Sequence, residues 1–243
     1  TIEVEAHKRE FKTITGVYKG KRLTVISTGI GTDNIDIVFN ELDALANIDF
    51  ENRTIKTEHT PLTFIRIGTS GAIQPEISVD SFLISEAAVG FDNLLHFYAN
   101  THFLNLPFSE ALKKHTNWSS QKSDPYMVTG DKALIAHFNT KDFATGVTAT
   151  NVGFYGPQGR TLRLGLQDDK LNDKLQSFTF QQQKITNLEM ETSGIYGMAK
   201  LLGHSAISLN VILANRADGT FSDSPKKTVN LLIEKTLAQL LKL

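Results

Sequence analysis

The chain has 243 residues, 40% hydrophobic and 21% charged, as is usual for a soluble globular protein. Its formal net charge of -1 gives no bulk attraction to nucleic acid or an anionic membrane, and its apolar runs are far shorter than the ~20 residues of a membrane span, so small ligands are expected. The absence of cysteine excludes disulfide scaffolds, thiolate metal sites and cysteine nucleophiles, and favours a cytoplasmic location.

The patterns near the start of the chain predict a hairpin followed by a helix. Two β-rich runs are joined at Lys19-Gly20, and the second arm of the hairpin is expected at Leu23–Ser27. Residues 32–48 then carry apolar side chains at helical spacing, with Thr32 or Asp33 available as N-cap.

The rest of the chain alternates strands with helices. Runs of apolar and β-branched residues predict strands at 64–67, 79–90, 143–153 and 205–214. Helical spacing predicts helices at 108–115, 189–203 and 224–243. Gly203 is expected to end the second helix, while Ser224 and Pro225 begin the third. The remainder of the polar segment 98–131 supports no assignment.

This alternation indicates one α/β domain over residues 1–243, with a three-layer α/β/α arrangement and a mixed, mostly parallel central sheet. In such folds ligands bind at the carboxyl ends of strands. Two expected strands end in small-residue turns, STGIG at 27–31 and GTSG at 68–71. These turns are therefore candidate parts of a binding site.

Arg66 stands between two isoleucines directly before the second of these turns. Hydroxyls and successive backbone N–H groups can bind an anion, and the planar guanidinium matches a phosphate. A structural ion pair with a carboxylate is an equal alternative, because a buried arginine must be paired. Asn34 breaks the dinucleotide fingerprint and no P-loop is present, so a bound anion would be free phosphate or a small phosphorylated ligand.

The segment Asn151–Arg160 combines two aromatic side chains with an amide and a guanidinium. Phe154 and Tyr155 can stack on a flat ring while Gln158 and Arg160 hydrogen-bond to its edge, which suits a nucleobase. The alternative is an ordinary loop with a buried aromatic anchor.

Two acidic residues, Glu189 and Glu191, stand at the start of a predicted helix. They either complement the helix dipole or supply a carboxylate that accepts hydrogen bonds from a vicinal diol such as that of ribose, for which Glu191 is the better candidate. The histidines show no metal-ligand spacing, and His96 is expected to be packed or hydrogen-bonded rather than catalytic.

A phosphate, a flat base and a ribose diol together describe the phosphorolysis of a nucleoside. The sequence resembles the nucleoside phosphorylase family (the purine and uridine phosphorylase superfamily), and its uridine phosphorylase branch in particular. The resemblance covers nearly the whole chain, is weak from about 98 to 145, and rests on motifs that occur in the family's order: HKREF (7–11), STGIG (27–31), RIGTSGAIQP (66–75), FYGPQGR (154–160), EMETS (189–193) and NR (215–216).

The resemblance implies roles for individual residues. The implied phosphate ligands are Arg66, Thr69 and, from a neighbouring subunit, Arg9. The implied ribose contacts are Met190 and Glu191. The implied base contacts are Phe154, Tyr155, Gln158, Arg160 and Arg216. Catalysis would rest on Arg66, Arg160 and Glu191.

The resemblance also implies a possible ion site and points to family motifs that this sequence lacks. Some members hold a potassium ion between subunits at positions that match Glu10, Ile30 and Asn34, although an asparagine here replaces the usual serine. The family's first strand supplies a Gly-Asp-Pro turn and an arginine for phosphate, preceded by a ribose-binding histidine. This chain has none of them, and we expect a segment before Thr1 to carry them.

The implied activity is reversible phosphorolysis of uridine to uracil and ribose 1-phosphate, a step of pyrimidine salvage. Phosphate is the co-substrate, no cofactor is required, and a homo-oligomer is implied, a dimer at least or a hexamer built from dimers. Asn215 replaces the catalytic aspartate of purine members, which favours a pyrimidine. The alternatives are a purine nucleoside phosphorylase, a nucleosidase that uses water, and a non-catalytic nucleoside-binding relative; the preference among uridine, thymidine and deoxyuridine stays open.

Overall fold

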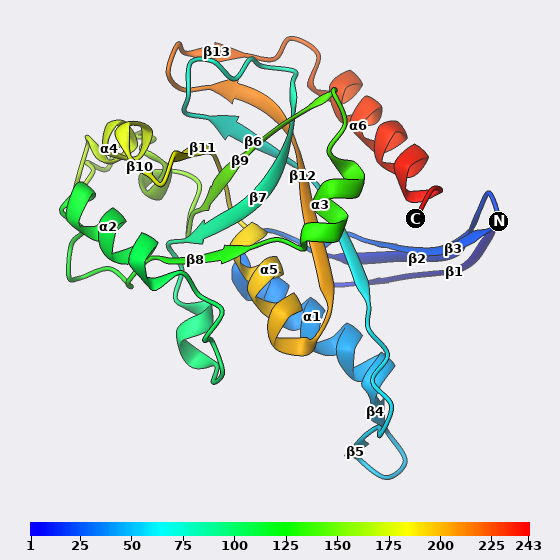
Figure 1. The fold of residues 1–243 in the computed structure, drawn as a ribbon. Coiled ribbons are helices and arrows are strands. Elements are labelled where there is room, and N and C mark those ends of the chain that lie inside the picture. Colours follow the sequence, from blue (N-terminus) through cyan, green and yellow to red (C-terminus); the bar gives the residue numbers. More distant parts are fainter.

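The computed structural model describes all residues from 1 to 243, and its centre is a mixed eight-stranded sheet (Figure 1). The strands of this sheet are β6 (Thr63–Ala72), β7 (Phe82–Gly90), β8 (Tyr126–Thr129), β9 (Phe143–Thr150), β10 (Thr179–Phe180), β11 (Gln183–Glu189), β12 (Ser205–Asn215) and β13 (Thr220–Phe221). The helices are α1 (Thr32–Asn47), α2 (Leu106–Thr116), α3 (Lys132–Phe138), α4 (Leu171–Ser177), α5 (Thr192–Leu202) and α6 (Pro225–Leu240), with short 3-10 helices η1 (Leu94–Phe97) and η2 (Gly156–Gln158).

Five strands of the sheet close into a ring because β12 pairs with both β6 and β7. It runs parallel to β6 over most of its length and antiparallel to β7 over a short stretch. The circuit is completed by the pairs β6–β11, β11–β9 and β9–β7. The long pairings, β12–β6 and β7–β9, are parallel, which confirms the expected mixed, mostly parallel sheet.

Three pairs of helices cover this ring with separate apolar clusters. Helices α1 and α5 enclose one cluster, which includes Ile35 and Met198. Helices α2 and α4 enclose a second through Phe108 and Leu175, and α3 and α6 enclose a third around Leu232. These clusters bury the apolar faces of the helices against the strands. No helix combines the length and hydropathy that crossing a bilayer requires.

The predicted hairpin is confirmed, but its strands lie outside the central sheet. Strands β1 (Ile2–Lys8), β2 (Phe11–Tyr18) and β3 (Lys21–Ile26) form a separate three-stranded antiparallel sheet that projects from the body in Figure 1. Every residue of β1 is exposed. A two-stranded sheet, β4 (Ile48–Asp49) with β5 (Thr54–Ile55), follows α1.

The Gly-Thr-Ser-Gly segment at 68–71 is strand rather than the predicted turn, and this prediction was wrong. Strand β6 continues to Ala72, since β12 pairs with it along its whole length and β11 pairs with its last residues. A glycine is required at position 68 because a Cβ there would lie only 2.1 Å from Nη1 of Arg66. The glycine makes room for a side chain of its own strand.

Other element boundaries also differ from the prediction. The N-cap of α1 is Gly31, not Thr32 or Asp33, and no side chain caps this helix. Helix α5 begins at Thr192 because Glu189 still belongs to β11. Strands β8 and β11 and helix α3 had no predicted counterpart in the sequence patterns. The predicted start of α6 is confirmed at Pro225, with Ser224 as N-cap, and Gly203 ends α5 in the left-handed conformation that favours glycine.

Buried polar side chains hydrogen-bond from strand to strand around the ring. Asn210 donates to the Ser85 hydroxyl (3.1 Å), which pairs with Thr148 (2.5 Å). Thr148 donates to Asn187 (2.9 Å), whose amide nitrogen donates to Ser70 (2.9 Å). Ser70 is 8% exposed and the other four are fully buried. The strands of the ring therefore carry a polar network beside one small apolar cluster of Ala72, Ile77, Leu83 and Ile212, while the three larger apolar clusters lie under the helices.

The hydroxyl of Tyr196 bridges β7 and β12 beyond the end of their short pairing, and this contact generates the first prediction. It donates to the Ser85 carbonyl (2.5 Å) and accepts from the Ser208 amide (2.9 Å). Tyr196→Phe leaves both buried groups unpaired, so we expect a loss of about 1–3 kcal/mol in the free energy of unfolding, measured with urea. The exposed Tyr18→Phe is the control. Equal stability of Tyr196→Phe and the wild type would contradict this account.

Candidate functional site

Arg66 forms a buried ion-pair cluster with two carboxylates at the end of β11. Its Nη2 lies 2.7 Å from Glu191 Oε2 and 3.1 Å from Glu189 Oε2. The three side chains are between 2% and 13% exposed. Of the two alternatives for Arg66, the structure thus shows the ion pair with carboxylates.

The other end of the guanidinium is held by β12. Nη1 of Arg66 donates to Asn210 Oδ1 (2.9 Å) and lies 3.3 Å from Ser208 Oγ. Asn210 is in turn anchored by the polar network of the ring through Ser85. Both terminal nitrogens of Arg66 therefore donate to acceptors. Its Nε–H takes part in none of these hydrogen bonds.

The two carboxylates have different surroundings. Glu189 accepts from the backbone N–H groups of Glu191 (2.9 Å) and Thr192 (3.0 Å) and from the Thr150 hydroxyl (2.6 Å). Glu191 accepts from the backbone N–H of Gly31 (2.9 Å) through its other oxygen. Glu189 thus caps the first turn of α5, and Glu191 joins the start of α5 to the start of α1.

The charges of this cluster do not balance. One guanidinium faces two carboxylates, which leaves a formal charge of about −1 when all three groups are ionised. Burial raises the pKa of Glu191; Arg66 opposes this shift and Glu189 adds to it. Burial alone would lower the pKa of Arg66, but the two carboxylates outweigh it and raise that pKa. With all three groups ionised, the cluster carries an excess of one negative charge.

The structure brings the predicted base-binding residues together around one amide. Oε1 of Gln158 accepts from Arg160 Nη1 (2.8 Å) and from Arg216 Nη2 (2.9 Å). Gln158 is 3% exposed, and its backbone carbonyl accepts a further bond from Arg216 (2.6 Å). Burial, together with the charge of Arg160, lowers the pKa of Arg216 to about 10. These contacts hold the amide in one orientation.

The aromatic side chains of this loop are open to solvent rather than buried. Phe154 is 52% exposed and Tyr155 is 53% exposed, with their rings edge to face at 5.5 Å. The guanidinium of Arg160 lies 3.7 Å from the centre of the Phe154 ring. The alternative of a buried aromatic anchor is therefore wrong, and an exposed apolar pair stands beside three oriented polar groups.

The remaining predicted residues are less closely grouped. Met190 is half buried between the two carboxylates. Thr69 is exposed on β6, and its odd spacing from Arg66 directs the two side chains to opposite faces of the strand. Arg9 occupies the exposed turn between β1 and β2 and makes no ion pair or hydrogen bond through its side chain within the chain. None of these three side chains forms a hydrogen bond or an ion pair with Arg66.

The three residues predicted for potassium do lie close together. The side-chain amide of Asn34 donates to the Ile30 carbonyl (3.3 Å). A Cβ on Gly29 would lie 2.3 Å from Asn34 Nδ2 and 3.1 Å from Glu10 Cγ, so Glu10 reaches the same turn. This turn has the positive φ angles that favour glycine, at Gly29 and Gly31. Binding of potassium here stays a prediction.

Two residues from the sequence analysis have structural partners. Asn215 donates to the carbonyls of Gln74 (2.9 Å) and Ile77 (2.8 Å), so its side chain ties β12 to the loop after β6. Nε2 of His96 lies 2.9 Å from the Asp124 carbonyl, as expected for a hydrogen-bonded histidine. Sequence reasoning missed the role of Asn210, although an asparagine inside an apolar strand was a visible signal.

A cavity of about 460 Å³ is lined in part by Phe91, Trp118 and Asp92 and by Gly156 and Pro157 of the loop that carries Gln158. None of the predicted site residues lines it. The Asp92 carboxylate is already bonded to the hydroxyls of Tyr126 (2.6 Å) and Ser193 (2.9 Å). This carboxylate therefore has its partners within the chain, and we propose no ligand for the cavity.

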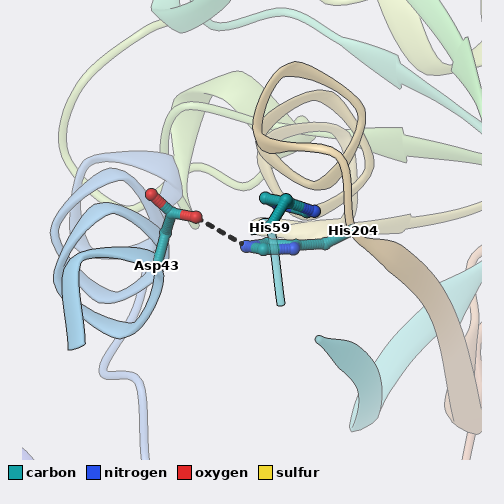
Figure 2. Close-up of side chains that lie close together, drawn as sticks. All are labelled: Asp43, His59 and His204. Atoms are coloured by element: carbon teal, nitrogen blue, oxygen red, sulfur yellow. Dashed lines mark ion pairs between the residues drawn. The ribbon is translucent and has the colours of Figure 1, made fainter. Parts of the chain in front are cut away.

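The structure also gathers Asp43, His59 and His204, which are far apart in the sequence (Figure 2). Asp43 lies on α1, His59 precedes β6, and His204 precedes β12. Nε2 of His204 lies 3.2 Å from Asp43 Oδ1. Their possible ligand atoms lie within 4.8 Å of one another, which raises the question of a metal site.

The hydrogen bonding of His204 does not fit a metal ligand. Its Nδ1 accepts from the backbone N–H of Leu62 (3.2 Å), so the ring proton belongs on Nε2, the nitrogen that faces Asp43. The rings of His59 and His204 also stack, with centroids 5.5 Å apart and planes at 19°. Stacked rings do not point their nitrogens at a common ion. We therefore read this cluster as structural.

Comparison with known proteins finds one family model and several relatives that match most or all of the chain. The family model described as the phosphorylase superfamily matches residues 1–243. The uridine phosphorylase of Thermococcus kodakarensis is 27% identical over 238 residues, which are 96% of this chain and 72% of that protein. The uridine phosphorylase of Haemophilus influenzae is 29% identical over 242 residues, or 96% of this chain and 81% of that protein.

A purine enzyme and a solved structure complete the comparison. The DeoD-type purine nucleoside phosphorylase of Geobacillus kaustophilus is 27% identical over 228 residues, or 92% of this chain and 76% of that protein. The crystal structure of a Trypanosoma brucei nucleoside phosphorylase that shows uridine phosphorylase activity superposes with a TM-score of 0.86 at 26% identity, covering 100% of this chain and 86% of that one.

The buried His204 generates a prediction about pH. Burial lowers its pKa below the ordinary 6.5, and Asp43 offsets this only in part. A depressed pKa contributes stability that is present above pH 6.5 and is lost as the pH falls through the lowered value. We expect unfolding free energy to fall between about pH 7.5 and about pH 5.5, and to fall less in His204→Asn, which keeps an acceptor for Leu62. The exposed His7→Asn is the control. An identical pH profile for His204→Asn and the wild type would refute the assignment.

Proposed function

Because the chain belongs to the phosphorylase superfamily, we propose that it is a nucleoside phosphorylase, a pentosyltransferase, whose substrate is the pyrimidine nucleoside uridine. The observation that carries this proposal is the cluster of Gln158, Arg160 and Arg216 beside the exposed Phe154. It offers a flat apolar surface next to oriented hydrogen-bond donors, which is the combination that a pyrimidine base requires.

The proposed reaction transfers a ribosyl group to phosphate. A phosphate oxygen attacks the anomeric carbon, and the bonding electrons of the N-glycosidic bond leave with the base. The anionic base takes up a proton from water to give uracil, and ribose 1-phosphate remains. Arg160 and the amide N–H groups of Gln158 stabilise the negative charge on the departing base.

Glu191 is proposed to hold the ribose. Its carboxylate lies at the start of α5 beside the half-buried Met190, and it can accept hydrogen bonds from the sugar hydroxyls. An ordered ribose presents its anomeric carbon to the phosphate, which is a proximity effect. Glu191 must be ionised for this role.

The phosphate subsite is proposed at Arg66 and Thr69, with Arg9 supplied by a neighbouring subunit; this requires Thr69 to turn its side chain from the opposite face of β6 toward Arg66. Arg66 is paired with two carboxylates, and the local formal charge is negative. A second source of positive charge is therefore required, and Arg9 is a guanidinium with no partner in its own chain. The proposal thus includes a homo-oligomer of at least two subunits. It also includes a cytoplasmic role in pyrimidine salvage and a potassium ion bound at Glu10, Ile30 and Asn34.

The substrate is tested by assaying uridine, deoxyuridine, thymidine and inosine with and without phosphate. We expect base release from uridine that depends on phosphate and produces ribose 1-phosphate. Faster cleavage of inosine would favour the purine alternative, which the Geobacillus relative keeps open. Release without phosphate would favour a nucleosidase. No turnover of any of the four would reject an enzymatic role for this site.

The role of the loop is tested with Arg160→Ala. Removing a donor to the departing base should lower kcat by about 10²- to 10³-fold, in line with the loss of an oxyanion donor. Arg163→Ala is the matched control, because Arg163 is an exposed arginine of the same loop with no side-chain hydrogen bond or ion pair in the chain. Near-normal uridine cleavage by Arg160→Ala would show that the base is bound elsewhere.

A further inference from the structure

Glu189 is the least exposed charged group of the site, yet the proposed phosphorolysis gives it no part. Its side chain is 2% exposed, against 11% for Glu191 and 13% for Arg66. Burying a carboxylate so completely is costly unless it is paired and hydrogen-bonded. Its contacts should therefore reveal what it does.

The first consequence of these contacts concerns the position of Glu191. Glu189 accepts from the backbone N–H of Glu191 itself (2.9 Å) and from that of Thr192 (3.0 and 3.1 Å). The hydroxyl of Thr150 holds the other side of the carboxylate (2.6 Å) and itself accepts from the Ser193 amide (2.9 Å). Glu189 thereby fixes the backbone from which the proposed ribose ligand projects.

The second consequence concerns charge. Arg66 and Glu191 alone would form a neutral pair, and Glu189, 3.1 Å from Arg66, brings the cluster to about −1. An anion that approaches Arg66 meets this excess negative charge. Phosphate binding is therefore weaker with Glu189 ionised than it would be with a neutral side chain of the same shape.

We propose that Glu189 is a positioning residue that holds Glu191 for the ribose and weakens the phosphate affinity of the site through its charge. Holding Glu191 favours binding of the nucleoside, whereas the charge of Glu189 disfavours binding of phosphate. Separate measurements of the affinity for each substrate therefore distinguish the two effects. The inference rests on the proposed function for its substrates, but its charge effect concerns inorganic phosphate alone.

Glu189→Gln is the test, because a glutamine can keep the contacts and lose the charge. Its carbonyl oxygen can accept from the amides of Glu191 and Thr192, while its NH₂ group donates to Thr150, whose hydroxyl can also accept. We expect the KM for phosphate to fall about threefold or more, since one unit charge has that effect across several ångströms even in water-like surroundings. The KM for uridine should change less than about twofold.

Asp131→Asn is the matched control. Asp131 caps α3 by accepting from the Leu134 amide (2.9 Å), so this variant also neutralises a carboxylate at a helix start, but away from the cluster. It should lose stability with both KM values unchanged. A merely structural role of Glu189 would make Glu189→Gln behave in the same way or bind both substrates less well, and that result would overturn the proposal.

Direct binding of inorganic phosphate, measured by calorimetry, separates this inference from the proposed function. If the wild type shows no turnover but Glu189→Gln binds phosphate more tightly, the proposed function is rejected and the charge effect stands. If the wild type turns over its substrate but the variant binds phosphate with unchanged affinity, the charge effect is rejected and the proposed function stands. If Glu189→Gln does not fold, Glu191→Gln makes the same change of charge, and a phosphate Kd no lower than that of the wild type would overturn the charge effect.

Discussion

The structure depends on the burial of Arg66 among two carboxylates and an asparagine. Charged groups removed from water need ionic and hydrogen-bonding partners, and here β6, β11, β12 and the start of α5 each supply one residue of the cluster. The same requirement explains Gly68, whose missing side chain leaves space for the guanidinium. Since the cluster is satisfied only when these elements meet in one register, it ties the closure of the ring to the formation of the site.

The division between polar and apolar packing follows from this arrangement. Asn210, Ser85 and Thr148 continue the hydrogen bonding of Arg66 around the strands, so this part of the ring contains few apolar side chains. Most apolar burial is provided instead by the three larger clusters between strands and helices. Hydrophobic packing thus stabilises the fold mainly on the helix-covered side of the strands, while directional bonds fix the positions of the groups that would contact a ligand.

Local sequence patterns predicted those elements whose conformation depends on residues close in the sequence. They failed for features that depend on contacts between distant residues. The hairpin at Lys19-Gly20 and the strand at 205–214 were predictable from turn residues and apolar runs, and one compact motif pointed to Gln158 and Arg160, which the structure joins by a hydrogen bond. The extension of β6 through Gly-Thr-Ser-Gly was not, because pairing with β12 overrides the turn preference of those residues. The partners of Arg66 and the group around His204 also escaped prediction, since they join residues more than 100 positions apart.

The way in which Gln158 is held has a consequence for the kind of molecule that its loop can recognise. Both lone pairs of its side-chain oxygen are taken by Arg160 and Arg216, so the amide has only hydrogens left to offer. A ring edge placed against this amide would therefore meet N–H donors and no acceptor. Under the proposed function, these donors would favour the electron-rich, deprotonated form of the base over its neutral form, and release of the base would follow its capture of a proton from water.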